Sequence, residues 1–184
     1  GFFMAISHPN LVWMDLEMSG LDPDTNVILE IATIVTDAHL NVLAEGPVLP
    51  VHQPENILTG MDDWNTRHHT QSGLVDRCRK SPYSVSDCEA ITLDFLRPYT
   101  KERSNILCGN SITQDRRFLY RYMPKLSEWL CYRNVDVSSI KELSYRWYPN
   151  LAPFEKQEKH QALDDIRESI AELEYYKKTI FKEF

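Results

Sequence analysis

Residues 11–18 read Leu-Val-Trp-Met-Asp-Leu-Glu-Met, an apolar run in which Asp15 and Glu17 are the only charged residues. Alternate side chains of a strand point to the same face, so both carboxylates are expected on one face. Two like charges this close repel each other, and neither is easily buried in its ionised form without a positive partner. Hard divalent cations take carboxylate oxygens as ligands. This stretch therefore predicts a buried strand that offers two carboxylates to a divalent cation.

The composition around this run is that of an ordinary globular protein, with 42% hydrophobic and 26% charged residues. A chain of 184 residues is long enough for one well-buried domain and short for two. We expect residues 1–184 to form a single domain, with residues 1–9 flexible or left over from cloning. The formal net charge of −7 argues against a long polyanion on a broad basic surface, but it allows a short anionic ligand bound through metal ions.

Other features of the composition concern location. No apolar run approaches the roughly 20 residues that span a bilayer, so no membrane partner is expected. We see no secretory signal in the N-terminal residues. The four cysteines are widely spaced and form no C-x-x-C pair, which favours reduced thiols over disulfides or a zinc site. These features indicate a cytoplasmic protein.

Strand-like segments come first along the chain and helical segments follow. β-Branched and apolar residues predict strands over residues 11–17, 27–36 and 41–51, and the short connections favour an antiparallel meander. Further strands are expected over residues 105–110 and 134–137. Helices are expected over residues 62–79, 86–97, 114–123, 139–148 and 161–181, with Ser86 and Glu89 as a capping box and Pro124 as a helix stop. The predicted fold class is α/β, a mixed sheet flanked by helices.

Three residues beyond the first strand extend the acidic pattern. Asp115 follows a short strand at the start of a helix, and Asp165 lies one turn into the last helix, five residues after His160. Each of these alone favours an ordinary interpretation, because acids commonly stabilise the first turn of a helix. Together, Asp-x-Glu, then Asp, then His-x-x-x-x-Asp form a distinctive ordered set.

This set resembles the DEDDh branch of the DnaQ-like 3′-to-5′ exonucleases, which have an RNase H-like fold. Within that branch, four motifs are similar to the oligoribonuclease family, and the likeness covers residues 10–181. The motifs are Trp13-Met-Asp-Leu-Glu-Met-Ser-Gly-Leu-Asp22, Met61-Asp-Asp-Trp64, Cys108–Ile112 with Gln114–Phe118, and His160–Ser169.

The resemblance implies a metal-dependent phosphodiester hydrolase. Asp15, Glu17, Asp115 and Asp165 would hold two divalent cations, for which Mg²⁺ or Mn²⁺ suits the oxygen ligands. His160 would act as general base toward the attacking water, because its ordinary pKa near 6.5 lies close to working pH. The implied substrate is very short RNA, down to dinucleotides, cut from the 3′ end to nucleoside 5′-monophosphates.

The family likeness also assigns residues to the bases. Leu21 matches an apolar wedge between two bases, and His69 matches a position near the substrate. Trp64 matches a surface on which a base stacks, an interaction worth about 1–3 kcal/mol per base. Without the family, Trp64 would be assigned to core packing.

A second group of residues matches a cap around the 5′ phosphate. Its members are Ser111, Arg133, Ser138 and Lys141, whose two hydroxyls and two cations suit a terminal phosphate. Tyr132 matches an aromatic residue that is contributed across a homodimer interface, and its alternative is ordinary burial at a strand edge.

Three other interpretations remain open on the sequence. A proofreading-type exonuclease acting on single-stranded DNA shares the acidic set, although a 5′ cap would not suit it. A non-catalytic nucleotide-binding module could keep the same fold. The third is an α/β domain whose acids merely face solvent.

Overall fold

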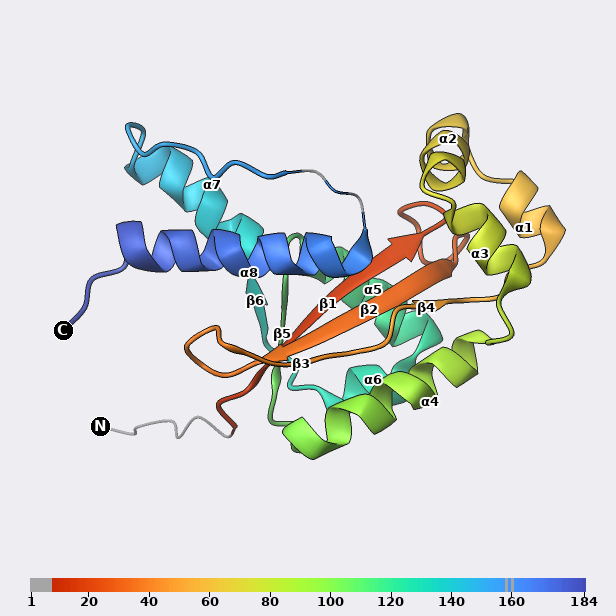
Figure 1. The fold of residues 1–184 in the computed structure, drawn as a ribbon, viewed down its shortest axis with the longest axis horizontal. Helices are drawn as coiled ribbons and strands as arrows, with labels where there is room; N and C mark the ends of the chain where they lie inside the picture. The colour runs from red at the N-terminus through yellow and green to blue at the C-terminus, as the bar shows by residue number, and fades with distance from the viewer. Residues whose placement is uncertain (1–7, 158, 160) are drawn as a thin grey trace.

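A mixed six-stranded sheet forms the centre of the computed structural model, which describes residues 8–157, 159 and 161–184 (Figure 1). The strands are β1 (Leu11–Met18), β2 (Ile28–Thr36), β3 (Val42–Glu45), β4 (Leu49–Pro50), β5 (Ile106–Gly109) and β6 (Asn134–Asp136). The helices are α1 (Glu55–Thr59), α2 (Asp63–Gln71), α3 (Leu74–Lys80), α4 (Val85–Leu96), the 3₁₀ turn η1 (Arg97–Tyr99), α5 (Ile112–Tyr122), α6 (Pro124–Trp129), α7 (Val137–Trp147) and α8 (Ala162–Thr179).

The sheet combines two kinds of pairing. Strands run in the order β3-β2-β1-β5-β6, and β4 also pairs with β2. β1 pairs antiparallel with β2, and β2 pairs antiparallel with β3 and β4. β1, β5 and β6 are parallel to one another. The predicted antiparallel meander with added parallel strands is therefore confirmed, and β1 lies at the junction of the two halves.

Side chains of β1 alternate between two cores. Val12, Met14 and Leu16 belong to a cluster that includes residues of α4, α5 and α6. Trp13 belongs to the cluster that includes residues of α7 and α8, and its indole Nε1 donates to Thr36 Oγ1 at 3.0 Å. Figure 1 shows α8 crossing this face of the sheet. Because Asp15 and Glu17 follow Trp13 at even spacing, the strand directs both carboxylates to the α8 face.

The predicted helix over residues 62–79 is wrong as a single element. It is two helices, α2 and α3, separated by Ser72 and Gly73, and the short α1 precedes them. Gly73 has a φ of 78°, a left-handed conformation that glycine adopts without steric cost. The break redirects the chain, and Figure 1 shows α2 beyond the ends of β1 and β2.

Three other element boundaries differ from expectation. The capping box of α4 is Ser84 with Asp87, whereas Glu89 is buried and accepts a hydrogen bond from Leu126 N at 3.1 Å. Pro124 opens α6 instead of merely ending α5, because the first turn of a helix needs no N–H from its first residue. The expected strand over 41–51 is interrupted between β3 and β4. Within the described part of the chain, no helix is long and apolar enough to cross a membrane.

Candidate active site

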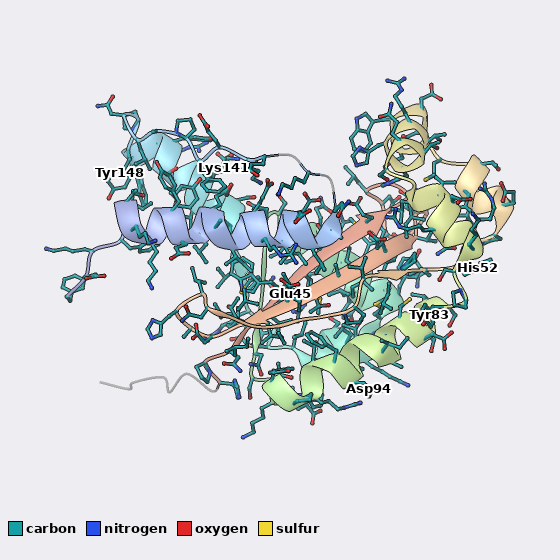
Figure 2. The ribbon with its side chains drawn as sticks, in the orientation of Figure 1. Glu45, His52, Tyr83, Asp94, Lys141 and Tyr148 are labelled. Carbon is teal, nitrogen blue, oxygen red and sulfur yellow. The ribbon has the colours of Figure 1, made fainter. Side chains whose placement is uncertain are left out.

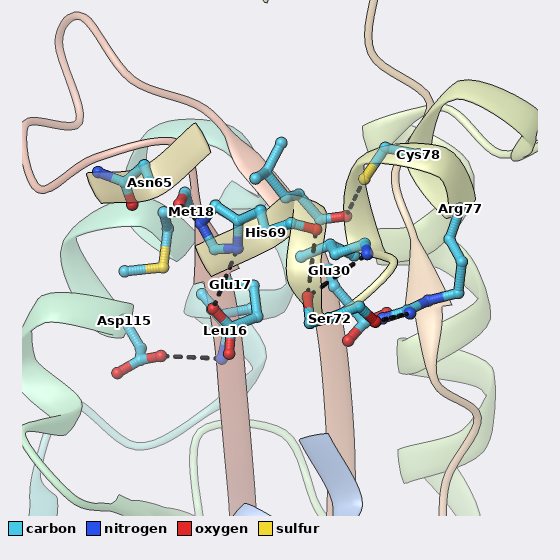
Figure 3. Close-up of polar contacts among 12 residues, drawn as sticks. Leu16, Glu17, Met18, Glu30, Asn65, His69, Ser72, Arg77, Cys78 and Asp115 are labelled. Atoms are coloured by element: carbon cyan, nitrogen blue, oxygen red, sulfur yellow. Dashed lines mark hydrogen bonds and ion pairs between the residues drawn. The ribbon is translucent and has the colours of Figure 1, made fainter. Parts of the chain in front are cut away.

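Carboxylates from three distant parts of the sequence meet at the end of β1. One carboxylate oxygen each from Asp15, Glu17 and Asp165 lies within 4.8 Å of the other two. Asp115, near the start of α5, reaches the same place, and its Oδ1 accepts a hydrogen bond from the backbone N of Leu16 at 2.9 Å (Figure 3). The structure thus brings together all four carboxylates that the sequence singled out.

These carboxylates are held where ionisation is unfavourable. Asp15 Oδ2 is buried and finds no hydrogen-bond partner among the described residues. Burial, and then the neighbouring charge of Glu17, raises the pKa of Asp15 well above its ordinary value. Burial followed by the charge of Glu30 raises the pKa of Glu17 to about 7, and burial raises the pKa of Asp115 to about 7. A bound cation would relieve this repulsion.

A cavity of about 250 Å³ opens beside the cluster. Asp15 and Asp165 line it, together with Asn110, Lys156 and Ser169. Asn110 Nδ2 donates to Ser169 Oγ at 2.8 Å, which ties the end of β5 to α8. Asp15 and Asp165 therefore face an open space and not a packed core.

His69 joins α2 to the end of β1. It is 2% exposed, and its Nε2 lies 2.9 Å from the backbone oxygen of Met18, next to a register shift in the β1–β2 pairing (Figure 3). His69 Nδ1 lies 3.9 Å from Glu17 Oε2. Burial lowers the pKa of His69, so this contact joins a neutral imidazole to the carboxyl at neutral pH.

The two side chains predicted to contact bases are both exposed, one in a turn and one on a helix. Trp64 on α2 is 65% exposed and stacks on His68, with ring centroids 4.8 Å apart. The interpretation of Trp64 as a core residue is therefore wrong. Leu21, in the turn after β1, is 69% exposed. Both side chains are available to a ligand.

Two residues of the predicted 5′ cap come together. Ser111 precedes α5 with a φ of 50°, and its backbone N donates to Asp136 Oδ1 at 2.9 Å and to Ser138 Oγ at 3.1 Å. Ser138 Oγ in turn donates to Asn110 Oδ1 at 2.9 Å. The two hydroxyls therefore lie at the adjoining starts of α5 and α7.

The remaining members of that cap have other partners. Lys141 lies on α7 beside α8 (Figure 2), with its Nζ 4.0 Å from Glu172 Oε1. Arg133 lies over the ring of Tyr132, which is 78% exposed, so the alternative of ordinary burial for Tyr132 is wrong. His160 lies outside the described residues.

Comparisons with known proteins agree with this geometry. The family described as "RNase_T: Exonuclease" matches residues 12–173. An oligoribonuclease from Pseudomonas aeruginosa strain PAO1 is 60% identical over 174 residues, which are 94% of this chain and 97% of the relative. The chain belongs to the oligoribonuclease family. Another oligoribonuclease, from Vibrio campbellii, is 59% identical over 97% of this chain and 99% of its own length. The resemblance inferred from the motifs is confirmed.

Solved structures of exonuclease I, one of them from E. coli in complex with single-stranded DNA, share the fold of this oligoribonuclease-family chain. The zinc-bound complex of exonuclease I with single-stranded DNA matches with a TM-score of 0.74 at 15% identity. The apo enzyme matches with a TM-score of 0.72, also at 15% identity. The chain spans 41% and 42% of those two proteins, respectively. This similarity confirms the mixed-sheet exonuclease fold.

One buried acid beside the oligoribonuclease-family carboxylates was missed by sequence reasoning. Glu30 on β2 is the Cα partner of Glu17 on β1 and is 3% exposed. Arg77 binds Glu30 Oε2 through Nη2 at 3.0 Å and donates through Nη1 to the backbone O of Ser72 at 2.9 Å (Figure 3). A single acid inside the apolar run of residues 27–36 was the available signal.

Proposed function

We propose that the chain hydrolyses short RNA from its 3′ end, down to dinucleotides, and releases nucleoside 5′-monophosphates. The observation that carries this proposal is the carboxylate cluster at the end of β1, which joins Asp15, Glu17 and Asp165 and lies beside Asp115. The curated relatives named above are oligoribonucleases that match nearly the full chain, which supports RNA as the substrate.

The donor set fits divalent cations. Carboxylate oxygens are the preferred ligands of Mg²⁺ and Mn²⁺, and the partnerless Asp15 Oδ2 is a buried acceptor of the kind that such an ion satisfies. Asp15, Glu17, Asp115 and Asp165 would hold two such ions. When bound, the ions supply charge stabilisation for the attacking and leaving oxygens of phosphodiester hydrolysis.

The chain's own side chains would handle the proton and the substrate. His160 is the proposed general base that takes a proton from the attacking water. Leu21 and Trp64 would hold the bases by insertion and stacking. Ser111 and Ser138 would bind a 5′ phosphate with Arg133 and Lys141, which must first leave Tyr132 and Glu172. A cap of this kind would exclude longer chains.

We also propose a cytoplasmic homodimer. The exposed Tyr132 is the residue expected to cross the dimer interface toward the partner's substrate. The four free cysteines are compatible with a reducing compartment. Sedimentation of the wild type and of Tyr132→Asp measures the assembly, and a monomeric wild type would contradict the dimer.

The deciding experiment measures cleavage of 5′-phosphorylated RNA of two, three, seven and twenty nucleotides in Mg²⁺. Asp165→Ala protein and EDTA serve as controls, and matched DNA oligonucleotides test the sugar. We expect rapid loss of the dinucleotide, slow loss of the longest RNA and silence in both controls. Faster cleavage of the longest chain, or of DNA, would support the general exonuclease instead. Binding without metal-dependent cleavage would support the nucleotide-binding module.

A further inference from the structure

A second group of potential ligands borders the carboxylate cluster and includes nitrogen. One ligand atom each from Glu17, His68 and His69 lies within 4.8 Å of the other two. Glu17 therefore belongs to two groups, one made of carboxylates alone and one made of a carboxylate and two imidazoles. The groups differ in chemistry because Mg²⁺ and Mn²⁺ suit oxygen ligands, whereas imidazole suits zinc and copper.

The orientation of His69 is fixed by its backbone partner. The Met18 carbonyl can only accept a hydrogen bond, so Nε2 of His69 carries the proton in this 2.9 Å contact. Nδ1 of the neutral ring then presents its lone pair toward Glu17 Oε2, 3.9 Å away. Metal-binding histidines typically donate their other ring N–H to a backbone carbonyl or a carboxylate in this way. His69 is 2% exposed, so packing also holds the ring in place.

The other two side chains have room to adjust. Two ligand atoms on a tetrahedral zinc ion are separated by about 3.4 Å, given bonds of about 2.0–2.1 Å. The ligand atoms lie up to 4.8 Å apart, so their separations must shorten by up to about 1.4 Å. Glu17 is 28% exposed and His68 is partly exposed, with its ring stacked on Trp64. Small rotations of these two side chains can complete the set around the fixed Nδ1 of His69.

We infer that Glu17, His68 and His69 form a zinc-binding site at the base of α2. Three protein ligands of the types His, His and Glu leave one position of a tetrahedral ion open. The functional consequence rests on the proposed nuclease activity. A zinc ion here withdraws Glu17 from the carboxylate cluster and fixes the His68–Trp64 stack, so zinc inhibits cleavage in Mg²⁺.

Copper provides a direct probe of the ligands, because nitrogen ligands split the Cu²⁺ electron paramagnetic resonance signal. The experiment uses full-length Asp165→Ala protein with one equivalent of Cu²⁺, so no catalytic activity is needed. We expect coupling to two nitrogens. His68→Phe keeps an aromatic ring against Trp64 but removes a ligand, so it should show one nitrogen. The matched control His160→Ala should keep both.

A signal without nitrogen coupling would overturn the zinc site, and so would coupling that disappears in His160→Ala but persists in His68→Phe. Because Cu²⁺ binds such ligands more tightly than Zn²⁺, the second expected result is loss of the copper signal only when zinc is present in large excess. In cleavage assays, the zinc concentration for half inhibition should rise at least tenfold in His68→Phe. If the wild type cleaves nothing, the proposed activity fails while the resonance measurement still decides the metal site.

Discussion

Glu17 and Glu30 face each other across the β1–β2 pairing and yet have opposite surroundings. Glu30 is buried with a guanidinium partner, Arg77, whose charge and hydrogen bond offset part of the pKa increase that burial causes. Glu17 lies among Asp15, Asp115 and Asp165, and its pKa is raised to about 7 by burial and by neighbouring negative charge. One acid is balanced within the fold, and the other is suited to a partner from solution.

This contrast separates an acid that has a structural partner from one that we propose to be functional. Buried ionised groups are tolerated when they are paired, and the fold provides that pairing at Glu30. At the end of β1 the fold accumulates carboxylates instead. Such uncompensated sites lower the stability of the metal-free protein in exchange for cation affinity.

The largest expected effect concerns the carboxylate cluster at the end of β1. Asp15→Asn removes a proposed cation ligand and one of the repelling charges at nearly constant shape. We expect Mg²⁺-dependent cleavage to fall by about 10³-fold or more, because metal coordination supplies several kcal/mol of transition-state stabilisation. In EDTA at pH 8 the variant should unfold at a higher urea concentration than the wild type. Its free energy of unfolding should be higher by roughly 1–2 kcal/mol. A variant less stable than the wild type in EDTA would contradict the repulsion argument.

The next effect is the pH dependence of metal-free stability. An acid whose folded pKa is raised binds more protons when folded, so the free energy of unfolding falls as pH rises from about 4.5 to the folded pKa of about 7. For Glu17 the loss is roughly 2–4 kcal/mol. Urea unfolding of the wild type and of Glu17→Gln between pH 4 and 8 isolates the contribution of Glu17 to the pH dependence of stability. Adding Mg²⁺ should make the free energy of unfolding of the wild type less dependent on pH. Parallel curves for the two proteins would show that Glu17 does not titrate in this window.

The third prediction concerns the ion pair between Glu30 and Arg77. Arg77→Ala leaves Glu30 buried without its cation and removes the hydrogen bond to Ser72 O. Because Arg77 is nearly half exposed, we expect a loss of only about 1–2 kcal/mol in the free energy of unfolding at pH 7. Adding Glu30→Gln should recover most of it, since the unpaired charge is then gone. No recovery in the double variant would place the loss in the Ser72 contact.

The smallest effect connects the two acids. Burial is the largest cause of the raised pKa of Glu17, and the negative charge of Glu30 is the next largest. Glu30→Gln should therefore lower the pKa of Glu17 and tighten Mg²⁺ binding at pH 6.5 by roughly two- to fivefold. Calorimetric titration at pH 6.5 and 8.5 measures this, and the gain should shrink at pH 8.5, where Glu17 is ionised in both proteins. Equal gains at both pH values would point to a conformational cause.

The sequence predicted what depends on regular periodicity and residue chemistry. Alternation placed Asp15 and Glu17 on one face of β1, and the acid spacing led to Asp115 and Asp165. It failed where one residue overrides a pattern. Gly73 splits a continuous helical pattern through its left-handed conformation. Ser84 caps α4 in place of Ser86 because Asp87, three residues after Ser84, completes a reciprocal capping box with it.

Long-range pairing was the other thing that the sequence could not provide. Nothing local to Glu30 identifies Arg77 as its partner, because the two meet only when α3 packs against β2. Lys141 follows Ser138 by three residues on α7, and its Nζ lies 4.0 Å from Oε1 of Glu172, which is buried in α8, a neighbour that the local sequence does not indicate. The exposure of Trp64 likewise follows from the placement of α2 past the end of the sheet.

Asp15 and Asp165 stand near opposite ends of the chain, on the first strand and the last helix. An ion held by both would act as a clip that closes most of the polypeptide into one loop, a constraint that the unfolded chain lacks. Magnesium starvation would then increase the rate at which α8 detaches and proteases gain access. The proteolytic lifetime of the protein should therefore follow the free magnesium concentration of its surroundings.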